Sequence, residues 1–403
     1  MAKKNQILSQ MSSDSSTYVG FTFDHVAGII EAWQAEFSRP VYMMTFGCTS
    51  QPIPSVAVKA MTDYAQKLGH AETYSGYEPV IGIPELKQAI AGHYRKNLGV
   101  TLSEGEVFVT DGAQMVLSEI QELFSRDSLV AMPNPTYPAY IEGTLSGGRR
   151  HLWMPCYEEN RFVPEPPSEK ADLIYLCFPN NPTGSVATYK DLQPFVDYAR
   201  EHRAVIIFDA AYRFFVNTLD VPRSIYEIDG AETCAIEIGS FSKEANFAGL
   251  RVGWCVIPRN LTIEDAGAEL HDLWTMQHEI RFWGPSNIAQ HGAIAVLTEQ
   301  GQRECQATID YYLKNAKMLC QAMEKLGLTC FGGTDSPYLW VKAPGDMDDW
   351  QFFRHLMHRT GIAGLPGSMF GSVGKGYLRL SALGKREGIE AALAGLPESV
   401  FDN

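Results

Sequence analysis

The chain has 403 residues, of which 45% are hydrophobic and 20% are charged, and its formal net charge is −14. This length suits a large domain with a smaller partner, since single domains hold roughly 100–200 residues, and the composition is that of an ordinary globular protein. The negative charge argues against DNA or another polyanion as the main partner, so we expect a small-molecule substrate.

The N-terminal segment and the cysteines bear on location and chemistry. Residues 1–16 hold two lysines but lack the apolar run of a secretory signal, and no run of about 18 apolar residues occurs anywhere. We therefore expect a cytoplasmic protein with no membrane segment. The eight cysteines form no CxxC pair, and Cys177, Cys234 and Cys255 lie inside apolar runs. We interpret them as reduced, buried side chains without a metal or disulfide role.

Short apolar runs rich in β-branched residues alternate with helical patterns between residues 105 and 260. Such runs, separated by helices, indicate a mostly parallel sheet that is buried on both faces. The predicted strands are residues 106–110, 128–133, 172–178, 204–209, 234–238 and 251–257.

The pattern changes after about residue 281. A helical stretch at 285–327 is followed by the segment PYLWVKAP, a helix near 348–360 and the strand GYLRLSAL. This arrangement is typical of a small α+β domain, whereas the preceding α/β pattern predicts a large one. We predict an N-terminal arm with part of the small domain at 1–45, the large domain at 46–280 and the small C-terminal domain at 281–403.

Polar residues follow the predicted strands, at the edge where parallel α/β sheets bind ligands. The segment DGAQ at 111–114 leads into a helical pattern, which suits a phosphate site or an ordinary turn. The segment PNNPTG at 179–184 holds an asparagine pair between prolines, in either a fixed site or an ordinary turn. Asp209 ends its strand, with Tyr212 three residues later. A protonated pyridine nitrogen would be a suitable partner for such a carboxylate, and a helix N-cap is the alternative.

A lysine and an arginine add two further functional groups. The strand CAIEI leads into Gly239-Ser240-Phe241-Ser242-Lys243, and Arg251 follows eight residues later. A lysine here could form an imine with an aldehyde, while the serines and Arg251 could bind a phosphate; a surface lysine is the alternative. Alternation in residues 377–381 places Arg379 on one face, as a carboxylate clamp or as a salt bridge at the rim. Together these groups supply every part of a pyridoxal-phosphate (PLP) site.

The motifs resemble the fold type I PLP enzymes of the class I/II aminotransferase superfamily, and most closely the LL-diaminopimelate aminotransferase family. The resemblance covers about residues 20–395. Its most specific segments are DGA (111–113), PTYPAY (135–140), FPNNPTG (178–184), FDAAY (208–212), PRSIYEI (222–228), SFSK to GLRVGW (240–254), PYLWVK (337–342) and GYLRLSALGKRE (376–387). It implies an α/β fold with a mostly parallel sheet of the seven-stranded type, PLP as cofactor, and a homodimer with shared active sites.

The resemblance also implies residue roles by position. Lys243 would hold PLP as a Schiff base, Asp209 would pair with the ring nitrogen, and Tyr212 would bond the phenolic oxygen. The remaining cofactor contacts would be Asn181 beside Tyr212, Tyr137 stacked on the ring, and Ala113, Gln114, Ser240, Ser242, Arg251 and the second subunit's Tyr77 at the phosphate. Arg379, with Asn181, would clamp the substrate α-carboxylate.

Four positions depart from the diaminopimelate family. That family usually has a lysine, a glutamate, an asparagine and a tyrosine where this chain has Gln114, Val80, Trp283 and Phe21. A site that lacks partners for a second ammonium and carboxylate should reject diaminopimelate by several kcal/mol. We therefore expect another small amino acid. Candidate substrate contacts are Trp283, Phe21, Gln114, Arg281, Asp24 and His25, with surface or core positions as the alternatives.

Several functions are compatible with these motifs. Amino-group transfer to a 2-oxo acid is the main prediction, and a PLP-dependent lyase, cyclase or replacement enzyme on the same fold is the alternative. A protein that keeps the fold only for binding is disfavoured by the intact Lys243, Asp209, Tyr212 and Arg379. A dinucleotide dehydrogenase needs a glycine-rich turn in its first unit, and the glycines at 371–376 lie elsewhere.

Overall fold

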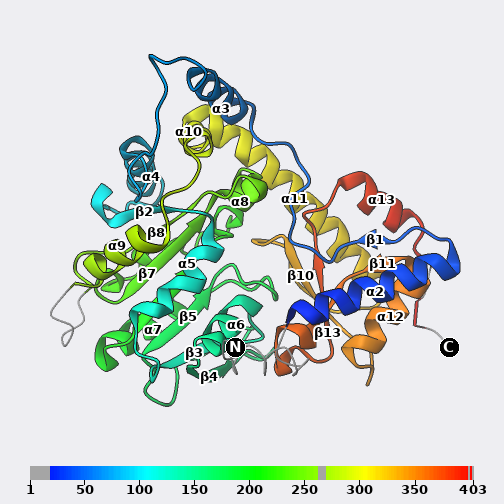
Figure 1. Ribbon diagram of the computed structural model, residues 1–403. Coiled ribbons are helices and arrows are strands. Elements are labelled where there is room, and N and C mark those ends of the chain that lie inside the picture. The colour runs from blue at the N-terminus through cyan, green and yellow to red at the C-terminus, as the bar shows by residue number, and fades with distance from the viewer. Residues whose placement is uncertain (1–18, 262–268, 398–399, 402–403) are drawn as a thin grey trace, which may run out of the picture.

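The computed structural model describes residues 19–261, 269–397 and 400–401. Two regions lie side by side, one around a seven-stranded sheet and one around a four-stranded sheet (Figure 1). The long helix α11 (Glu299–Lys325) runs from the first region into the second. In the described part of the chain, no helix is both long and apolar enough to cross a membrane.

The remaining helices and the strands have the following bounds. The helices are α2 (Val19–Phe37), α3 (Ser55–Lys67), α4 (Pro84–Leu98), α5 (Ala113–Glu119), α6 (Pro138–Ser146), α7 (Tyr189–His202), α8 (Phe241–Glu244), α9 (Leu270–Arg281), α10 (Asn287–Val296), α12 (Asp349–Thr360) and α13 (Arg386–Ala394). The strands are β1 (Tyr42–Met43), β2 (Val107–Thr110), β3 (Leu129–Asn134), β4 (Arg150–Pro155), β5 (Leu173–Cys177), β6 (Val205–Asp209), β7 (Ala235–Ser240), β8 (Gly253–Val256), β9 (Cys330–Gly332), β10 (Tyr338–Lys342), β11 (Ile362–Ala363), β12 (Leu365–Pro366) and β13 (Tyr377–Ser381).

The large sheet has the strand order β2-β8-β7-β6-β5-β3-β4, and only β8 runs antiparallel to its neighbours. Strands β5, β6 and β7 are buried along their whole length, because helices cover both faces of the sheet. This sheet confirms the predicted α/β fold class. The sequence did not reveal β4, because Met154 is the one buried residue in this edge strand.

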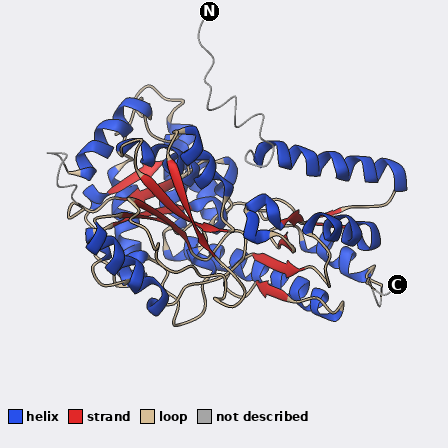
Figure 2. Cartoon of the chain, turned by 90° about the horizontal axis from the view of Figure 1, so that it is seen from below, coloured by secondary structure: helices blue, strands red, loops and turns tan. Residues whose placement is uncertain are grey.

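The small sheet is antiparallel, in the order β12-β13-β10-β9, and β1 pairs separately with β11. Helix α2 packs into the same region, where Val26, Ile30 and Trp33 are buried in the core around β10 and β13. Figure 2 shows α2 lying along the small region, away from the large sheet. The segment before residue 46 thus contributes to the core of the small region.

The predicted helical stretch at 285–327 forms two helices, with a break at Thr298. The Thr298 hydroxyl accepts a hydrogen bond from the Gly301 N–H at 3.2 Å and so caps α11. Helix α10 buries Ala289 and Ala293 in the core that contains β2 and β8. We therefore propose that the boundary between the regions lies within α11, later than the predicted position at 281.

Candidate active site

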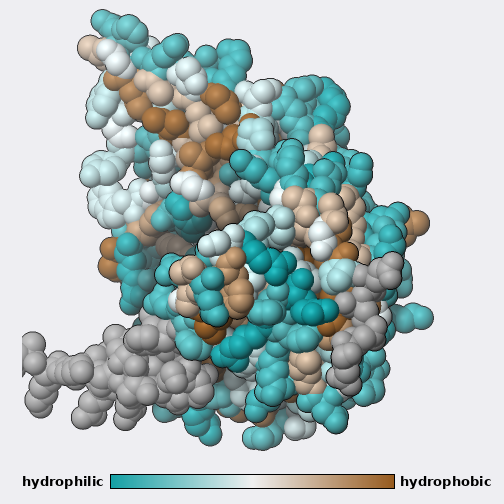
Figure 3. Space-filling view, turned by 90° about the vertical axis from the view of Figure 1, so that its right-hand side faces the viewer, coloured by the Kyte–Doolittle hydropathy of each residue, from teal (hydrophilic) through white to brown (hydrophobic). Residues whose placement is uncertain are grey.

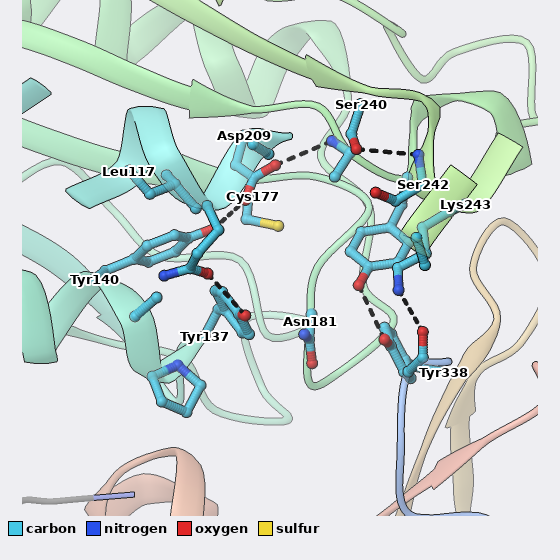
Figure 4. Close-up of a pocket in the computed structure, with 18 of the residues that line it drawn as sticks. Leu117, Tyr137, Tyr140, Cys177, Asn181, Asp209, Ser240, Ser242, Lys243 and Tyr338 are labelled. Atoms are coloured by element: carbon cyan, nitrogen blue, oxygen red, sulfur yellow. Dashed lines mark hydrogen bonds between the residues drawn. The ribbon is translucent and has the colours of Figure 1, made fainter. Parts of the chain in front are cut away.

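A cavity of about 610 Å³ lies at the carboxyl edge of the large sheet and is also lined by residues of the small region. Parallel strands β5, β6 and β7 end there together, so the residues that follow them meet at one edge. Among its lining residues are the predicted positions Ala113, Gln114, Tyr137, Asn181, Asp209, Tyr212, Ser240, Ser242, Lys243, Arg251 and Arg379. Figure 4 shows Asp209 and Lys243 on different sides of this cavity, with Asn181 between them and below.

Asp209 is a buried carboxylate with neutral donors. The Tyr140 hydroxyl donates to Oδ2 at 2.7 Å and the Ala211 N–H donates to Oδ1 at 3.0 Å (Figure 4). Burial raises the pKa of Asp209, and these two hydrogen bonds only partly oppose it. Because a buried carboxylate without a cationic partner is costly, the protonated ring nitrogen of PLP fits this position.

Lys243 lies on the short helix α8, which follows β7 directly. Its ammonium donates to the Gly47 carbonyl oxygen. A side chain at Gly47 would collide with the Tyr338 hydroxyl, so the close approach of this backbone requires glycine. The Tyr338 hydroxyl also shares a hydrogen bond of 2.9 Å with Tyr212. A Cβ on Gly47 would lie 3.6 Å from Lys243 Nζ as well as against Tyr338, so Tyr212, Tyr338 and Lys243 gather around this backbone.

Hydrogen-bond donors gather around the turn at Gly112, where α5 begins. Gly112 has a φ of 77°, and a Cβ there would lie 2.5 Å from Nη2 of Arg251. Arg251 itself donates to the carbonyl oxygens of Asp111 at 3.1 Å and Ala248 at 3.0 Å. The backbone N–H groups of the first α5 turn lack partners within their own helix. Together with Ser240 and Ser242 they form a donor set that fits a phosphate.

Arg379 is buried on β13 rather than paired at the rim. Its Nη1 donates to Asn181 Oδ1 and its Nη2 to the Thr45 carbonyl oxygen, both at 2.6 Å. The guanidinium carbon lies 4.6 Å from the Tyr338 ring centroid and 4.8 Å from that of Phe370. Nε has no hydrogen-bond partner among the described residues. Because no described carboxylate pairs with this buried arginine, its guanidinium fits the carboxylate of a substrate.

Several lining residues were not anticipated from the sequence. Tyr140 holds Asp209, Tyr338 contacts Tyr212, and Phe23, Cys177 and Phe370 complete the wall. The motif PTYPAY contains Tyr140, but the sequence does not indicate which of its tyrosines reaches a carboxylate. Tyr338 enters the site because β10 pairs with β13, and no local pattern predicts that pairing.

Tyr137 and Gln114 lie against each other at the cavity wall. The Tyr137 hydroxyl donates to Oε1 of Gln114 at 3.1 Å. Burial raises the pKa of Tyr137 to about 12, so its hydroxyl stays protonated and remains a donor. Gln114 lines the cavity, and its contact with a substrate stays a prediction.

Trp283 and Arg281, two predicted substrate contacts, and Tyr77, predicted to reach the phosphate of the second subunit, do not line the cavity of their own chain. Tyr77 and Trp283 are 86% and 61% exposed and pack edge to face, with ring centroids 5.1 Å apart. Arg281 pairs with Glu119 and Glu122, so its charge is already compensated on the surface.

The N-terminal candidates Asp24 and His25 also do not line the cavity. Asp24 and His25 are exposed on α2, and the His25 ring lies 5.3 Å from that of Trp350. Their neighbour Phe23 lines the cavity instead. Phe21 belongs to α2, but its side chain lies outside the described residues. Among the described residues, no group of three His, Cys, Asp or Glu side chains could hold a metal ion.

Comparisons with known proteins agree with this geometry. The family of class I and II aminotransferases matches residues 44–396. An LL-diaminopimelate aminotransferase of Lachnospira eligens is 41% identical over 386 residues, covering 93% of this chain and 95% of that protein. Another, from Methanosphaera stadtmanae, is 39% identical over 396 residues and covers 94% of this chain and 96% of its own. The structure of the Chlamydomonas reinhardtii LL-diaminopimelate aminotransferase superposes with a TM-score of 0.86 at 34% identity, covering 93% and 94% of the two chains. The chain therefore belongs to the class I and II aminotransferases, enzymes of fold type I that use PLP.

Proposed function

We propose that this enzyme transfers the amino group of a small α-amino acid to a 2-oxo acid, with Lys243 as the residue that bonds PLP. The observation that carries the proposal is that Lys243, Asp209 and Arg379 face one cavity from three separate elements. An amine, a buried carboxylate and a buried guanidinium are the partners for the PLP aldehyde, the ring nitrogen and the substrate carboxylate.

The residues around the cavity would hold the cofactor as follows. Asp209 would bind the ring nitrogen and keep it protonated, because a nearby negative charge raises the pKa of that nitrogen. Tyr212, with Asn181 beside it, would bond the phenolic oxygen, and Tyr137 would stack on the ring. The phosphate would be bound by the backbone of Ala113 and Gln114 and by Ser240, Ser242 and Arg251. Bound PLP supplies a positively charged ring that draws electrons away from the substrate α-carbon.

Lys243 and Arg379 would act on the substrate itself. Lys243 Nζ would take the proton from the substrate α-carbon as a general base and would return it to the cofactor carbon as a general acid. The Gly47 carbonyl oxygen accepts from this Nζ and would orient the amine. Arg379 would bind the α-carboxylate with two parallel hydrogen bonds, while Asn181 holds its guanidinium in place at 2.6 Å.

We propose that the far end of this enzyme's substrate carries less charge than the far end of diaminopimelate. The names of the similar proteins make diaminopimelate a candidate substrate. In this chain, however, Gln114 is a neutral amide hydrogen-bonded to Tyr137. Val80 and Trp283 do not line the cavity of their own chain, and we propose that they face the partner subunit's cavity, where they carry no charge for a distant ammonium or carboxylate. We therefore propose that diaminopimelate is a poor substrate.

A homodimer with shared sites completes the proposal. Apolar side chains are exposed on the single chain at Val58, Tyr74, Tyr77, Ile280 and Trp283. Figure 3 shows hydrophobic residues gathered in a band near the top of its view, the end at which α3 lies in Figure 1. A band of exposed apolar surface such as the one in Figure 3 marks protein contacts. Tyr77 would reach the phosphate in the partner subunit.

A cytoplasmic location for the protein stays a prediction.

Trapping and turnover assays test the function. Borohydride reduction of the holoenzyme should fix PLP on Lys243, detected by peptide mass spectrometry, and an adduct on another lysine would contradict the assignment. Incubation with a panel of amino acids should convert bound PLP to the pyridoxamine form, which 2-oxoglutarate should reverse. Ammonia release or ring closure without an acceptor would favour the lyase or cyclase alternative.

The substrate proposal has its own matched test. Diaminopimelate with 2-oxoglutarate should turn over poorly in the wild type. The combined variant Trp283→Asn, Gln114→Lys and Val80→Glu should gain diaminopimelate activity, because each change restores a polar partner worth about 1–3 kcal/mol. Efficient wild-type turnover of diaminopimelate would show that these differences do not exclude it.

A further inference from the structure

Arg213, the residue after Tyr212, forms a buried ion pair with Glu237 outside the active-site cavity. Arg213 and Glu237 are 2% and 0% exposed, and Nη1 of Arg213 donates to Oε1 of Glu237 at 3.2 Å. Arg213 lies in the turn after β6, and Glu237 lies within β7. The roles proposed above for the PLP site do not use this pair.

The Glu237 carboxylate is fully hydrogen-bonded. Besides Arg213, the Tyr94 hydroxyl donates to Oε1 at 2.5 Å. The Ser224 hydroxyl at 2.6 Å and the Ile225 N–H at 2.8 Å donate to Oε2. Four donors from three separate parts of the chain therefore hold this carboxylate in one orientation.

The Arg213 guanidinium has one hydrogen-bonding partner and an aromatic cage. Its central carbon lies 4.4 Å, 4.7 Å and 5.0 Å from the ring centroids of Tyr94, Phe214 and Trp254. Within the described residues its Nε and Nη2 have no hydrogen-bond acceptor. Glu237 is thus the group that sets the direction of this side chain, since the rings constrain its position but accept no conventional hydrogen bond.

Both ends of the pair attach to elements of the active site. The Arg213 N–H donates to the Ala210 carbonyl oxygen at 3.1 Å, which closes the turn that presents Tyr212. Glu237 precedes Ser240 by three residues and Lys243 by six on the same strand and its continuation. Strand β7 packs tightly against Trp254, because a side chain at Gly239 would collide with the indole.

We propose that Arg213 and Glu237 are a positioning pair, which sets the placement of Tyr212 relative to Lys243 and so the hydrogen bond of Tyr212 to the cofactor. The proposal deepens the proposed function and rests on the role given there to Tyr212. A well-packed apolar pair often stabilises a fold as well as a buried ion pair does. An apolar pair would lack the directional hydrogen bond that orients the turn. The Arg213–Glu237 pair therefore has an effect on the turn that packing alone would not give.

A neutral double variant separates positioning from stability. Arg213→Met alone should lower Tm by about 5 °C or more, because it leaves a buried carboxylate without its cation. Arg213→Met with Glu237→Gln should restore Tm to near the wild-type value, since no unpaired charge remains. The double variant should nevertheless bind PLP more weakly, show a shifted visible band, and lose about tenfold to 100-fold in kcat with a smaller change in KM.

A double-mutant cycle with Tyr212→Phe identifies the route of the effect. If the pair acts through Tyr212, its neutralisation should change the visible spectrum and PLP affinity much less in the Tyr212→Phe background. Equal effects in both backgrounds would overturn the proposal, as would a double variant with wild-type spectrum, PLP affinity and kcat. Spectrum and affinity are measured without an amino acid, so they decide the matter even if the proposed transamination is wrong.

Should the double variant not fold, Arg213→Lys is the second test. Lysine keeps the positive charge but lacks the planar guanidinium. This variant should fold, bind PLP more weakly and shift the visible band in the same direction. Wild-type values in Arg213→Lys would overturn the proposal.

Discussion

Among the described residues, three buried carboxyl groups lie in β6, in β7 and in the helix α8 that follows β7, and each has a different set of partners. Asp209 accepts from Tyr140 and Ala211, Glu237 accepts from Arg213 and three further donors, and Glu244 accepts from Gln302 at 2.8 Å. The same functional group, a buried carboxyl, therefore has three different environments in this region of the fold. The hydrogen-bond partners of each carboxyl group determine how costly its negative charge is.

Glu244 should make stability depend on pH. Burial raises the pKa of Glu244 to about 7 from its ordinary value of 4.5. A raised carboxyl pKa favours the folded state while the group is protonated, so this contribution is fully present below about pH 4.5 and is lost as pH rises through about 7. Glu244→Gln is neutral at every pH and should raise stability at pH 8 by about 2–3 kcal/mol, with little change at pH 5.

Thermal unfolding of the wild type and Glu244→Gln at both pH values checks this expectation. The exposed Glu279→Gln on α9 is the control for the loss of one negative charge. It should show no pH-dependent difference. An equal effect of Glu244→Gln at pH 5 and pH 8 would mean that the buried group does not titrate in this range.

At the scale of elements, the turn between β2 and α5 depends on glycine. Gly112 has a positive φ of 77° and lies against Arg251. Gly112→Ala should strain this turn by more than about 1 kcal/mol and push the guanidinium away from the phosphate position. The dissociation constant of PLP, measured by titrating the apoenzyme, should rise about tenfold or more.

Gly249→Ala is the matched control for this substitution. Gly249 also lies near Arg251 in sequence, but a Cβ there meets nothing within 4 Å and its φ is not positive. PLP binding in Gly249→Ala should equal that of the wild type. Wild-type binding in Gly112→Ala would show that Arg251 does not contribute to the phosphate site.

At the scale of the whole molecule, a shared site makes a prediction about mixed dimers. Tyr77 is 86% exposed in its own chain, and we propose that it acts in the partner subunit. A dimer that pairs a Lys243→Ala subunit with a Tyr77→Ala subunit should contain one fully wild-type site. That site should bind PLP with wild-type affinity and show about half of the wild-type activity, because the intact Lys243 and Tyr77 come from different subunits.

Co-expression with two affinity tags isolates the mixed dimer for this measurement. The Tyr77→Ala homodimer, in which both sites lack the hydroxyl, provides the reference for weakened binding. If the mixed dimer binds PLP no better than that homodimer, Tyr77 acts within its own chain or has no role in binding.

The sequence by itself determined the fold class and most of the cofactor side of the cavity. Asp209, Lys243 and the segment at 111–114 each follow an apolar strand, and parallel strands bring such positions to one edge. Lys243 and Asp209 could therefore be expected at the same edge of the sheet before any contact was known. The alternation around Arg379 placed it on one face of its strand but left open whether that face is buried, and the structure buries both faces from Leu378 to Ser381.

Only the tertiary structure decided the contacts between residues far apart in the chain. Tyr140 and Asp209 are 69 positions apart and Tyr212 and Tyr338 are 126 apart, and no local pattern encodes their meeting. The same holds for Arg281, whose charge is compensated by Glu119 on a different helix. These contacts arise from the packing of complete elements, whose relative positions depend on the whole core rather than on any one segment.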